Sequence, residues 1–284
     1  MLVTVGQFGA TTDKSANLEA ATALIEQAAA QGSQLIVLPE NAMYSNSDVT
    51  ADIVSETEPL DGPFATTIRA LAKKHGIAVV AGMTEAPAGG SGMAEGQTGG
   101  PGATEASAGG FGKPSNTVIA VDSGGDLVGV YRKVHLYDAF GYRESDRVQA
   151  HKPEPLIFTL GDLTFGVMTC YDLRFPEMAR FLVDAGAEAL VVPAAWVAGP
   201  AKEDHWITLA RARAIENTAY VIACGQTGPT CTGHSAVVDP MGQIAASAGE
   251  APGVASAVIG AERVKTVRAK NPSLTNRRFE VVPA

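Results

Sequence analysis

The stretch Leu35-Ile36-Val37-Leu38-Pro39-Glu40 decides the fold class of this 284-residue chain. Its apolar run is too short for a free helix and is typical of a strand buried on both faces. An Ala-rich segment at 15–31 precedes it, with apolar residues at three- and four-residue steps, Asp13 or Ser15 as a possible cap and Gly32 at its end. Helix and strand together predict a layered α/β domain with a parallel sheet.

The same alternation continues along the chain. It predicts helices at 64–75, 176–185 and 204–217, and strands at 2–8, 77–81, 117–122, 163–169, 189–193 and 219–224. Later strands at 234–239 and 253–259 are expected to be joined by a turn at Pro240-Met241-Gly242. Residues 85–112 are rich in Gly, Ala, Ser, Pro and Thr, so we expect a flexible surface insertion within one domain spanning 1–284. Gly112-Lys113 is not a P-loop, because Pro114 follows where Ser or Thr is needed.

Composition and charge narrow the function classes. With 46% apolar and 18% charged residues, the chain is expected to be globular rather than disordered. A net charge of −9 argues against nucleic-acid or anionic-membrane partners. No apolar run approaches the roughly 20 residues of a membrane span, and the first residues lack the features of a signal peptide. A cytoplasmic location is the resulting expectation.

Two reactive side chains follow predicted strands. Glu40 stands directly after an apolar run, so partial burial would raise the pKa of its carboxyl and suit it to act as a general base. Strand alternation places Tyr131, Lys133 and His135 on one face, where the Lys133 ammonium could stabilise an oxyanion. Taken alone, each segment favours a solvated surface residue over a catalytic one.

A third reactive side chain, Cys170, closes the predicted strand 163–169, and Pro176 opens the next helix. Backbone N–H groups and the positive end of a helix would favour the thiolate there. The alternative is a buried structural cysteine. The other two cysteines, Cys224 and Cys231, lie near His234, but this set lacks the paired spacing and the four ligands of a structural zinc site, so no metal is expected.

Glu40, Lys133 and Cys170, in this order and with these flanks, resemble the Glu-Lys-Cys triad of the nitrilase superfamily of carbon-nitrogen hydrolases. The blocks that carry the resemblance are Leu38-Pro39-Glu40, Tyr131-Arg132-Lys133-Val134-His135-Leu136, Cys170-Tyr171-Asp172-Leu173-Arg174-Phe175-Pro176-Glu177, Arg211-Ala212-Arg213-Ala214-Ile215-Glu216-Asn217, and Gly233-His234-Ser235 with Pro240-Met241-Gly242. Except for the 85–112 insertion, they span nearly the whole chain.

The resemblance implies an α-β-β-α sandwich and a cofactor-free thiol hydrolase. In it Glu40 is the base, Cys170 the nucleophile, and Lys133 with the backbone N–H of Tyr171 stabilises the oxyanion. Glu144 is similar to the second glutamate of the superfamily, which holds the lysine; a solvated loop residue is the alternative. Members of the superfamily commonly form homodimers or larger homo-oligomers, and the segment 264–284 looks like an arm that crosses to a partner subunit.

The substrate class is indicated by the residues after the nucleophile. True nitrilases usually carry Trp-Glu there, whereas Tyr171-Asp172 is similar to amidases acting on ω-amides of dicarboxylic acids and on deaminated glutathione. Arg174 could bind a substrate carboxylate or form a structural ion pair with an acid such as Glu177. The pocket is expected to include Ala195 and Trp196, where relatives more often carry Phe, and Tyr44, which could instead be a packing residue.

Other function classes fit the sequence less well. A nitrilase or an N-carbamoyl amide hydrolase of the same superfamily is the alternative enzyme. A non-catalytic binding protein with this fold would have lost a triad member, and none is lost. A nucleotide-binding oxidoreductase would need Gly-x-Gly-x-x-Gly after the first strand, where only Gly6 and Gly9 occur. A small-molecule amide is therefore the expected partner.

Overall fold

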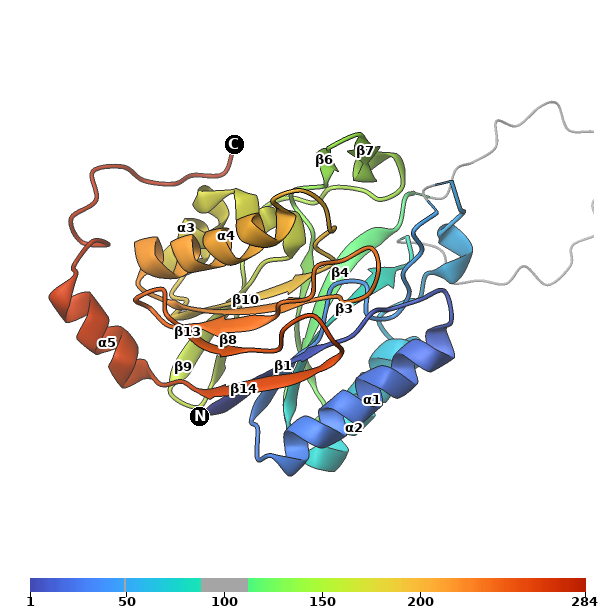
Figure 1. Cartoon of the computed structure of the whole chain (residues 1–284), viewed down its shortest axis with the longest axis horizontal. Helices are drawn as coiled ribbons and strands as arrows, with labels where there is room; N and C mark the ends of the chain where they lie inside the picture. Colours follow the sequence, from blue (N-terminus) through green and yellow to red (C-terminus); the bar gives the residue numbers. More distant parts are fainter. Residues whose placement is uncertain (49, 88–111) are drawn as a thin grey trace, which may run out of the picture.

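Two six-stranded sheets lie face to face at the centre of the chain (Figure 1). The computed structural model describes residues 1–48, 50–87 and 112–284. The first sheet has the order β14 (Gly253–Val258), β1 (Leu2–Gln7), β2 (Leu35–Val37), β3 (Ala78–Glu85), β4 (Ser115–Val121), β5 (Leu127–Arg132). The second has the order β13 (Ile244–Ser247), β12 (Ala236–Val238), β11 (Tyr220–Gly225), β10 (Ala189–Ala194), β9 (Leu163–Val167), β8 (Leu156–Leu160).

Helices cover the outer faces of both sheets, which gives four layers. On the first sheet lie α1 (Lys14–Ala30) and α2 (Pro63–His75), and on the second lie α3 (Pro176–Asp184) and α4 (Lys202–Asn217) (Figure 1). Short elements complete the chain: the hairpin β6 (Asp138–Ala139) and β7 (Tyr142–Arg143), and the 3₁₀ helices η1 (Val54–Glu56), η2 (Glu144–Asp146) and η3 (Cys170–Arg174). The predicted α-β-β-α sandwich is confirmed.

The segment 35–38 shows why the layers form. Leu35 and Val37 point into the core between the two sheets, whereas Ile36 and Leu38 pack against the apolar faces of α1 and α2. All four side chains are fully buried. Each contributes about 1.5 to 3 kcal/mol by leaving water, which is why both faces of this strand are apolar.

Three predictions about the strands need correction. The centre of each sheet is parallel as predicted, in β1–β2–β3 and in β9–β10–β11. Both sheets are nevertheless mixed, because their outer strands pair antiparallel. The turn at 240–242 joins β12 to β13 and not to β14, which pairs with β1 in the other sheet. The strand β13 is too short and too exposed to give a clear sequence pattern.

Glu85 does not begin the insertion: it is the last residue of β3 and pairs with Arg132 at 2.6 Å. Residues 88–111 of the predicted insertion lie outside the described residues.

The segment predicted to be an arm begins with the helix α5 (Ala261–Lys270), whose Val264 and Val267 are buried in the same chain. From residue 271 onward most residues are exposed. None of the helices in the described part of the chain has the length and apolar character that crossing a membrane requires.

Candidate active site

The predicted triad residues come together beside a cavity of about 520 Å³. Glu40 follows β2, Lys133 follows β5 and Cys170 follows β9, and all three line the cavity. The ends of strands from both sheets therefore build one site, as is usual for α/β sheets.

Close packing fixes Glu40. A side chain on the neighbouring Gly82 would place its Cβ 2.6 Å from the Glu40 Cα, so only glycine allows this approach. The Gln226 amide donates to the Glu40 backbone carbonyl at 2.8 Å, and the Ala195 N–H donates to Glu40 Oε2 at 2.6 Å. Both backbone and carboxylate of Glu40 are thus held from the second sheet.

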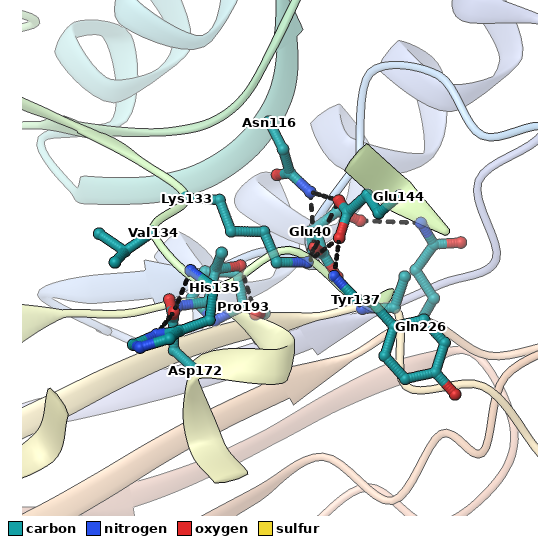
Figure 2. Close-up of polar contacts among 12 residues, drawn as sticks. Glu40, Asn116, Lys133, Val134, His135, Tyr137, Glu144, Asp172, Pro193 and Gln226 are labelled. Atoms are coloured by element: carbon teal, nitrogen blue, oxygen red, sulfur yellow. Dashed lines mark hydrogen bonds and ion pairs between the residues drawn. The ribbon is translucent and has the colours of Figure 1, made fainter. Parts of the chain in front are cut away.

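Lys133 lies between two carboxylates (Figure 2). Its Nζ is 2.8 Å from Glu40 Oε1 and 2.9 Å from Glu144 Oε2, and only 1% of the residue is exposed. Asn116 donates from Nδ2 to Glu40 Oε1 at 2.7 Å and to Glu144 Oε1 at 2.9 Å. The Tyr137 N–H donates to Glu144 Oε2 at 2.7 Å. Glu144 is therefore a buried partner of the lysine rather than a solvated loop residue.

Cys170 is the first residue of η3 and forms a sharp turn after β9. Its backbone has φ +46°, which is strained for a residue with a side chain. The N–H of Tyr171 lies in the first turn of η3, where the helix itself offers no acceptor, so it is available to a ligand. The turn thus presents a thiol and a backbone donor together.

The charges in the site correct two expectations from the sequence. Burial alone would raise the pKa of Glu40, but the charge and hydrogen bond of Lys133 outweigh it and hold that pKa below its usual value. Burial and the Glu40 charge raise the pKa of Cys170 well above its usual value, against the opposing effect of Lys133. Burial disfavours the charged form of Lys133, yet Glu144 and Glu40 raise its pKa well above normal. The free site thus holds an ionised carboxylate and a protonated thiol.

Asp172, which sequence analysis did not assign, joins the nucleophile turn to the lysine segment (Figure 2). It is fully buried and accepts from the Tyr131 hydroxyl at 2.6 Å, the Thr169 N–H at 2.8 Å and the His135 N–H at 3.2 Å. His135 Nδ1 is a further 2.8 Å contact. Since Tyr131 and His135 flank Lys133, one carboxylate fixes both segments.

The cavity also contains the predicted substrate-binding residues Arg174, Trp196 and Ala195. The Arg174 guanidinium lies 4.8 Å from the centre of the Trp196 ring, and its Nη2 is 3.3 Å from His205 Nδ1. Within the described residues it forms no ion pair with Glu177 or any other acid, and its Nε has no hydrogen-bond partner. The structural ion pair considered for Arg174 is absent from this part of the chain.

Tyr44, predicted as a pocket residue or a packing residue, does not line this cavity but lines a neighbouring hollow that shares Asn41 and Glu144 with it. It belongs to the core beneath α1 and α2, and its hydroxyl accepts from Asn46 at 3.2 Å. Of the other cysteines, Cys231 lines the cavity and Cys224 does not. Burial raises their pKa values to about 11 and about 12, respectively. Nowhere in the described ranges do His, Cys, Asp and Glu side chains cluster as metal ligands would.

Asn116, Tyr137, Lys202 and Asp172 contribute to the site and were missed from the sequence. The triad residues were predicted because each follows a strand. Asn116 lies near the start of β4 and does not follow a strand, so the same pattern could not predict it. Asp172 could have been predicted from the sequence. It lies two residues past the nucleophile in a buried turn, and a buried carboxylate needs hydrogen-bond donors around it.

Comparison with known proteins shows the family to which the chain belongs. The carbon-nitrogen hydrolase family model matches residues 2–269. A deaminated glutathione amidase of Escherichia coli O157:H7 is 38% identical over 98% of both chains. An omega-amidase of Saccharomyces cerevisiae is 33% identical over 96% of this chain and 91% of its own. A solved Saccharomyces cerevisiae structure, a member of branch 10 of the nitrilase superfamily, covers 98% of this chain and 97% of its own with TM-score 0.80 and 30% identity. The chain belongs to the carbon-nitrogen hydrolase family of the nitrilase superfamily.

Proposed function

We propose that this carbon-nitrogen hydrolase releases ammonia from a small amide that carries a carboxylate at its other end. The observation that supports this most directly is the placement of Cys170 and Arg174 in one cavity, with no acidic partner for Arg174 in the described residues. A guanidinium on an aromatic wall is a strong partner for a carboxylate. The thiol would act on the amide while Arg174 binds the opposite end of the substrate.

In the proposed reaction, the proton of the Cys170 thiol passes to the Glu40 carboxylate while the sulfur bonds to the amide carbon. The carbonyl oxygen becomes an oxyanion, stabilised by the Lys133 ammonium and the Tyr171 N–H. The C–N bond then breaks, and Glu40 gives its proton to the departing amide nitrogen, which leaves as ammonia. Glu40 next accepts a proton from water as the water oxygen bonds to the thioester carbon. The C–S bond then breaks, the acid leaves, and Glu40 returns the proton to the Cys170 sulfur.

Glu144 has a positioning role in this proposal. It holds Lys133 from the side opposite Glu40, at 2.9 Å, and accepts from Asn116 and Tyr137. Because the ammonium has a second carboxylate partner, it stays charged when Glu40 takes up a proton. The lysine can then stabilise the oxyanion at the moment the base is neutral.

The names of the relatives support an amide rather than a nitrile substrate. Among them are proteins called deaminated glutathione amidase in Escherichia coli and in Synechocystis, and an omega-amidase of Saccharomyces cerevisiae. The proposal takes from these names only that an amide is cleaved. The carboxylate at the far end of the substrate is inferred from Arg174.

Release of the amide nitrogen across matched compounds tests the proposal, measured as ammonia for every compound except deaminated glutathione, whose amide nitrogen leaves as the amine of a dipeptide and is measured as that amine. The panel is glutaramate, its neutral counterpart pentanamide, 4-cyanobutyrate, an N-carbamoyl amino acid and deaminated glutathione. We expect an acid-ended amide to have the highest kcat/KM. A higher value for 4-cyanobutyrate would indicate a nitrilase, and one for the N-carbamoyl compound would indicate a carbamoyl hydrolase. A preference for pentanamide would contradict the role of Arg174.

Arg174→Ala separates substrate binding from a structural role. Loss of a charged partner in a partly closed cavity should raise the KM for glutaramate by roughly tens- to a thousandfold. The ratio of kcat/KM for glutaramate to that for pentanamide should fall with it. Arg143→Ala is the matched control, because Arg143 is exposed and does not line the cavity. Equal losses for both amides would place Arg174 in a structural role.

A further inference from the structure

A second cation faces the same cavity, on the first turn of α4. Lys202 lines the cavity, and only 8% of the residue is exposed. Its Nζ lies 3.4 Å from the centre of the Phe140 ring, which the Arg174 guanidinium also approaches at 5.6 Å. The two cations therefore converge on one aromatic ring of the β6–β7 hairpin, although they come from different elements.

Lys202 has no counter-charge of its own. Its ammonium forms no ion pair with any acid in the described part of the chain, and its hydrogen-bond partner is the Tyr137 hydroxyl at 2.9 Å. The cavity's acids, Glu40 and Glu144, both bind Lys133. Burial and the Arg174 charge lower the pKa of Lys202, which shows that its charged form lacks compensation. A nearly buried cation of this kind is stabilised when an anion binds beside it.

Fold stability does not account for a lysine at this position. Lys202 is the first residue of α4, where the helix dipole disfavours a positive charge and favours an anion. The contact that holds Trp196 uses the Lys202 backbone carbonyl, which accepts from Trp196 Nε1 at 2.7 Å. The ammonium donates to the Tyr137 hydroxyl and lies over the Phe140 ring, which leaves two of its three N–H donors for a ligand.

We propose that Lys202 is a specificity-determining residue whose ammonium binds the substrate carboxylate jointly with Arg174. This inference rests on the proposed function, in which that carboxylate exists. Tyr137 takes part: its hydroxyl accepts from Lys202 and keeps its own proton for the same carboxylate. Burial and Cys170 raise the pKa of Tyr137, so that proton is retained. The carboxylate thus meets two cations and the O–H donor of Tyr137.

The test compares Lys202→Met, which keeps the length of the side chain and removes its charge, with Lys202→Arg, which keeps the charge. Lys73→Met, on the exposed face of α2, is the matched control. For each variant the readout is the ratio of kcat/KM for glutaramate to that for pentanamide. We expect Lys202→Met to lower this ratio about 10- to 100-fold, mainly through the KM for glutaramate. Lys202→Arg should retain most of the ratio.

Substrate binding and a double variant test the role of Lys202 independently of turnover by the single variants. In the Cys170→Ala background, glutaramate binding by calorimetry reports affinity without chemistry, and Lys202→Met should weaken it by a similar factor. The double variant Arg174→Gln with Lys202→Met should lose less than the product of the two single losses, because both groups contact one carboxylate.

The outcomes separate this inference from the proposed function. A ratio in Lys202→Met no lower than in Lys73→Met, or an equal loss for both amides, would overturn the role of Lys202 while Arg174 keeps its own. If the unaltered enzyme does not prefer glutaramate to pentanamide, the proposed function itself fails. Fully multiplicative losses in the double variant would contradict a shared carboxylate.

Discussion

At the scale of single residues, the balance of charge around Lys133 determines how the site can work. Two carboxylates and one ammonium are buried together, so ionising Cys170 in advance would add a second net negative charge. In the proposed mechanism, the proton therefore leaves the thiol only as sulfur attacks, when the charge moves to an oxyanion beside Lys133. We accordingly expect Glu40 to act as a base in the transition state and not in the free enzyme.

The pH dependence of turnover follows from these shifts. With pentanamide as substrate, we expect kcat/KM to stay nearly flat from about pH 6 to about pH 9. Glu40 must be ionised, and because its pKa is lowered, activity should be lost only as pH falls below the ordinary carboxyl value of 4.5. Lys133 must be protonated, and its raised pKa delays the alkaline loss beyond the ordinary value of 10.5. Circular dichroism at each pH controls for unfolding.

The absorbance of the Cys170 thiolate tests the predicted protonation state independently of turnover. Because the pKa of Cys170 is raised, thiolate absorbance from it should be absent at neutral pH. An acid limb centred near about pH 7, together with thiolate absorbance that titrates there, would show a preformed thiolate and contradict this account.

The residues that the sequence predicts correctly share a local signal. Glu40, Lys133 and Cys170 each stand after an apolar or alternating run, so their positions at strand ends were predictable. The sign of the Glu40 shift was not, because it depends on Lys133, which lies 93 residues away in sequence but 2.8 Å away in space. Lys202 was missed because the predicted helix began at residue 204; the observed N-cap, Ala201, has no capping side chain.

At the scale of elements, Asp172 ties η3 to the segment after β5. Asp172→Asn keeps the shape but places an amide donor against N–H donors that need an acceptor. We expect a cost of about 1 to 3 kcal/mol in stability for each buried group left unsatisfied. A loss of kcat/KM should accompany it, equal for glutaramate and pentanamide, because both Cys170 and Lys133 shift.

Asp184→Asn is the control for this variant, since Asp184 pairs with Arg277 near the surface and should matter little. Comparable kcat/KM values for Asp172→Asn and Asp184→Asn would show that the buried carboxylate does not position the reacting groups.

The connection between β3 and β4 can be shortened without disturbing the strands. Glu85 and Ser115 are paired across the two antiparallel strands, so the residues on either side of 88–110 start from neighbouring positions. Loop length changes stability only logarithmically. We expect a protein lacking residues 88–110 to keep its fold and most of its amidase activity. Aggregation, or a thermal midpoint lower by about 10 °C or more, would contradict this.

At the scale of the whole molecule, two sheets supply different parts of the site. The first sheet gives Glu40, Asn116 and Lys133, and the second gives Cys170 and Ala195. The alternation of helices and strands predicted only a layered α/β domain, and the sandwich followed from the resemblance of the motif blocks to the superfamily. The mixed strand directions were not predictable, because each apolar run looks the same in either direction.

The resemblance to the superfamily predicts that the C-terminal segment crosses to a second copy of the chain. Phe279 and Val282 in this segment are 88% and 75% exposed and would be the apolar side chains that such a copy covers. We predict a homodimer, measured by light scattering as twice the mass of the chain, and a shift toward monomer when residues 271–284 are removed. A monomer at micromolar concentration in the full chain would contradict the prediction.

In the proposed mechanism, Cys170 forms a thioester with the acyl group of an acid-ended amide. Acid quench of the enzyme during turnover of glutaramate, followed by peptide mass mapping, detects this intermediate. We expect a glutaryl adduct on the peptide that contains Cys170, and no such adduct in Cys170→Ala. A glutaryl adduct on Cys231 or Cys224, or turnover that persists in Cys170→Ala, would contradict this mechanism.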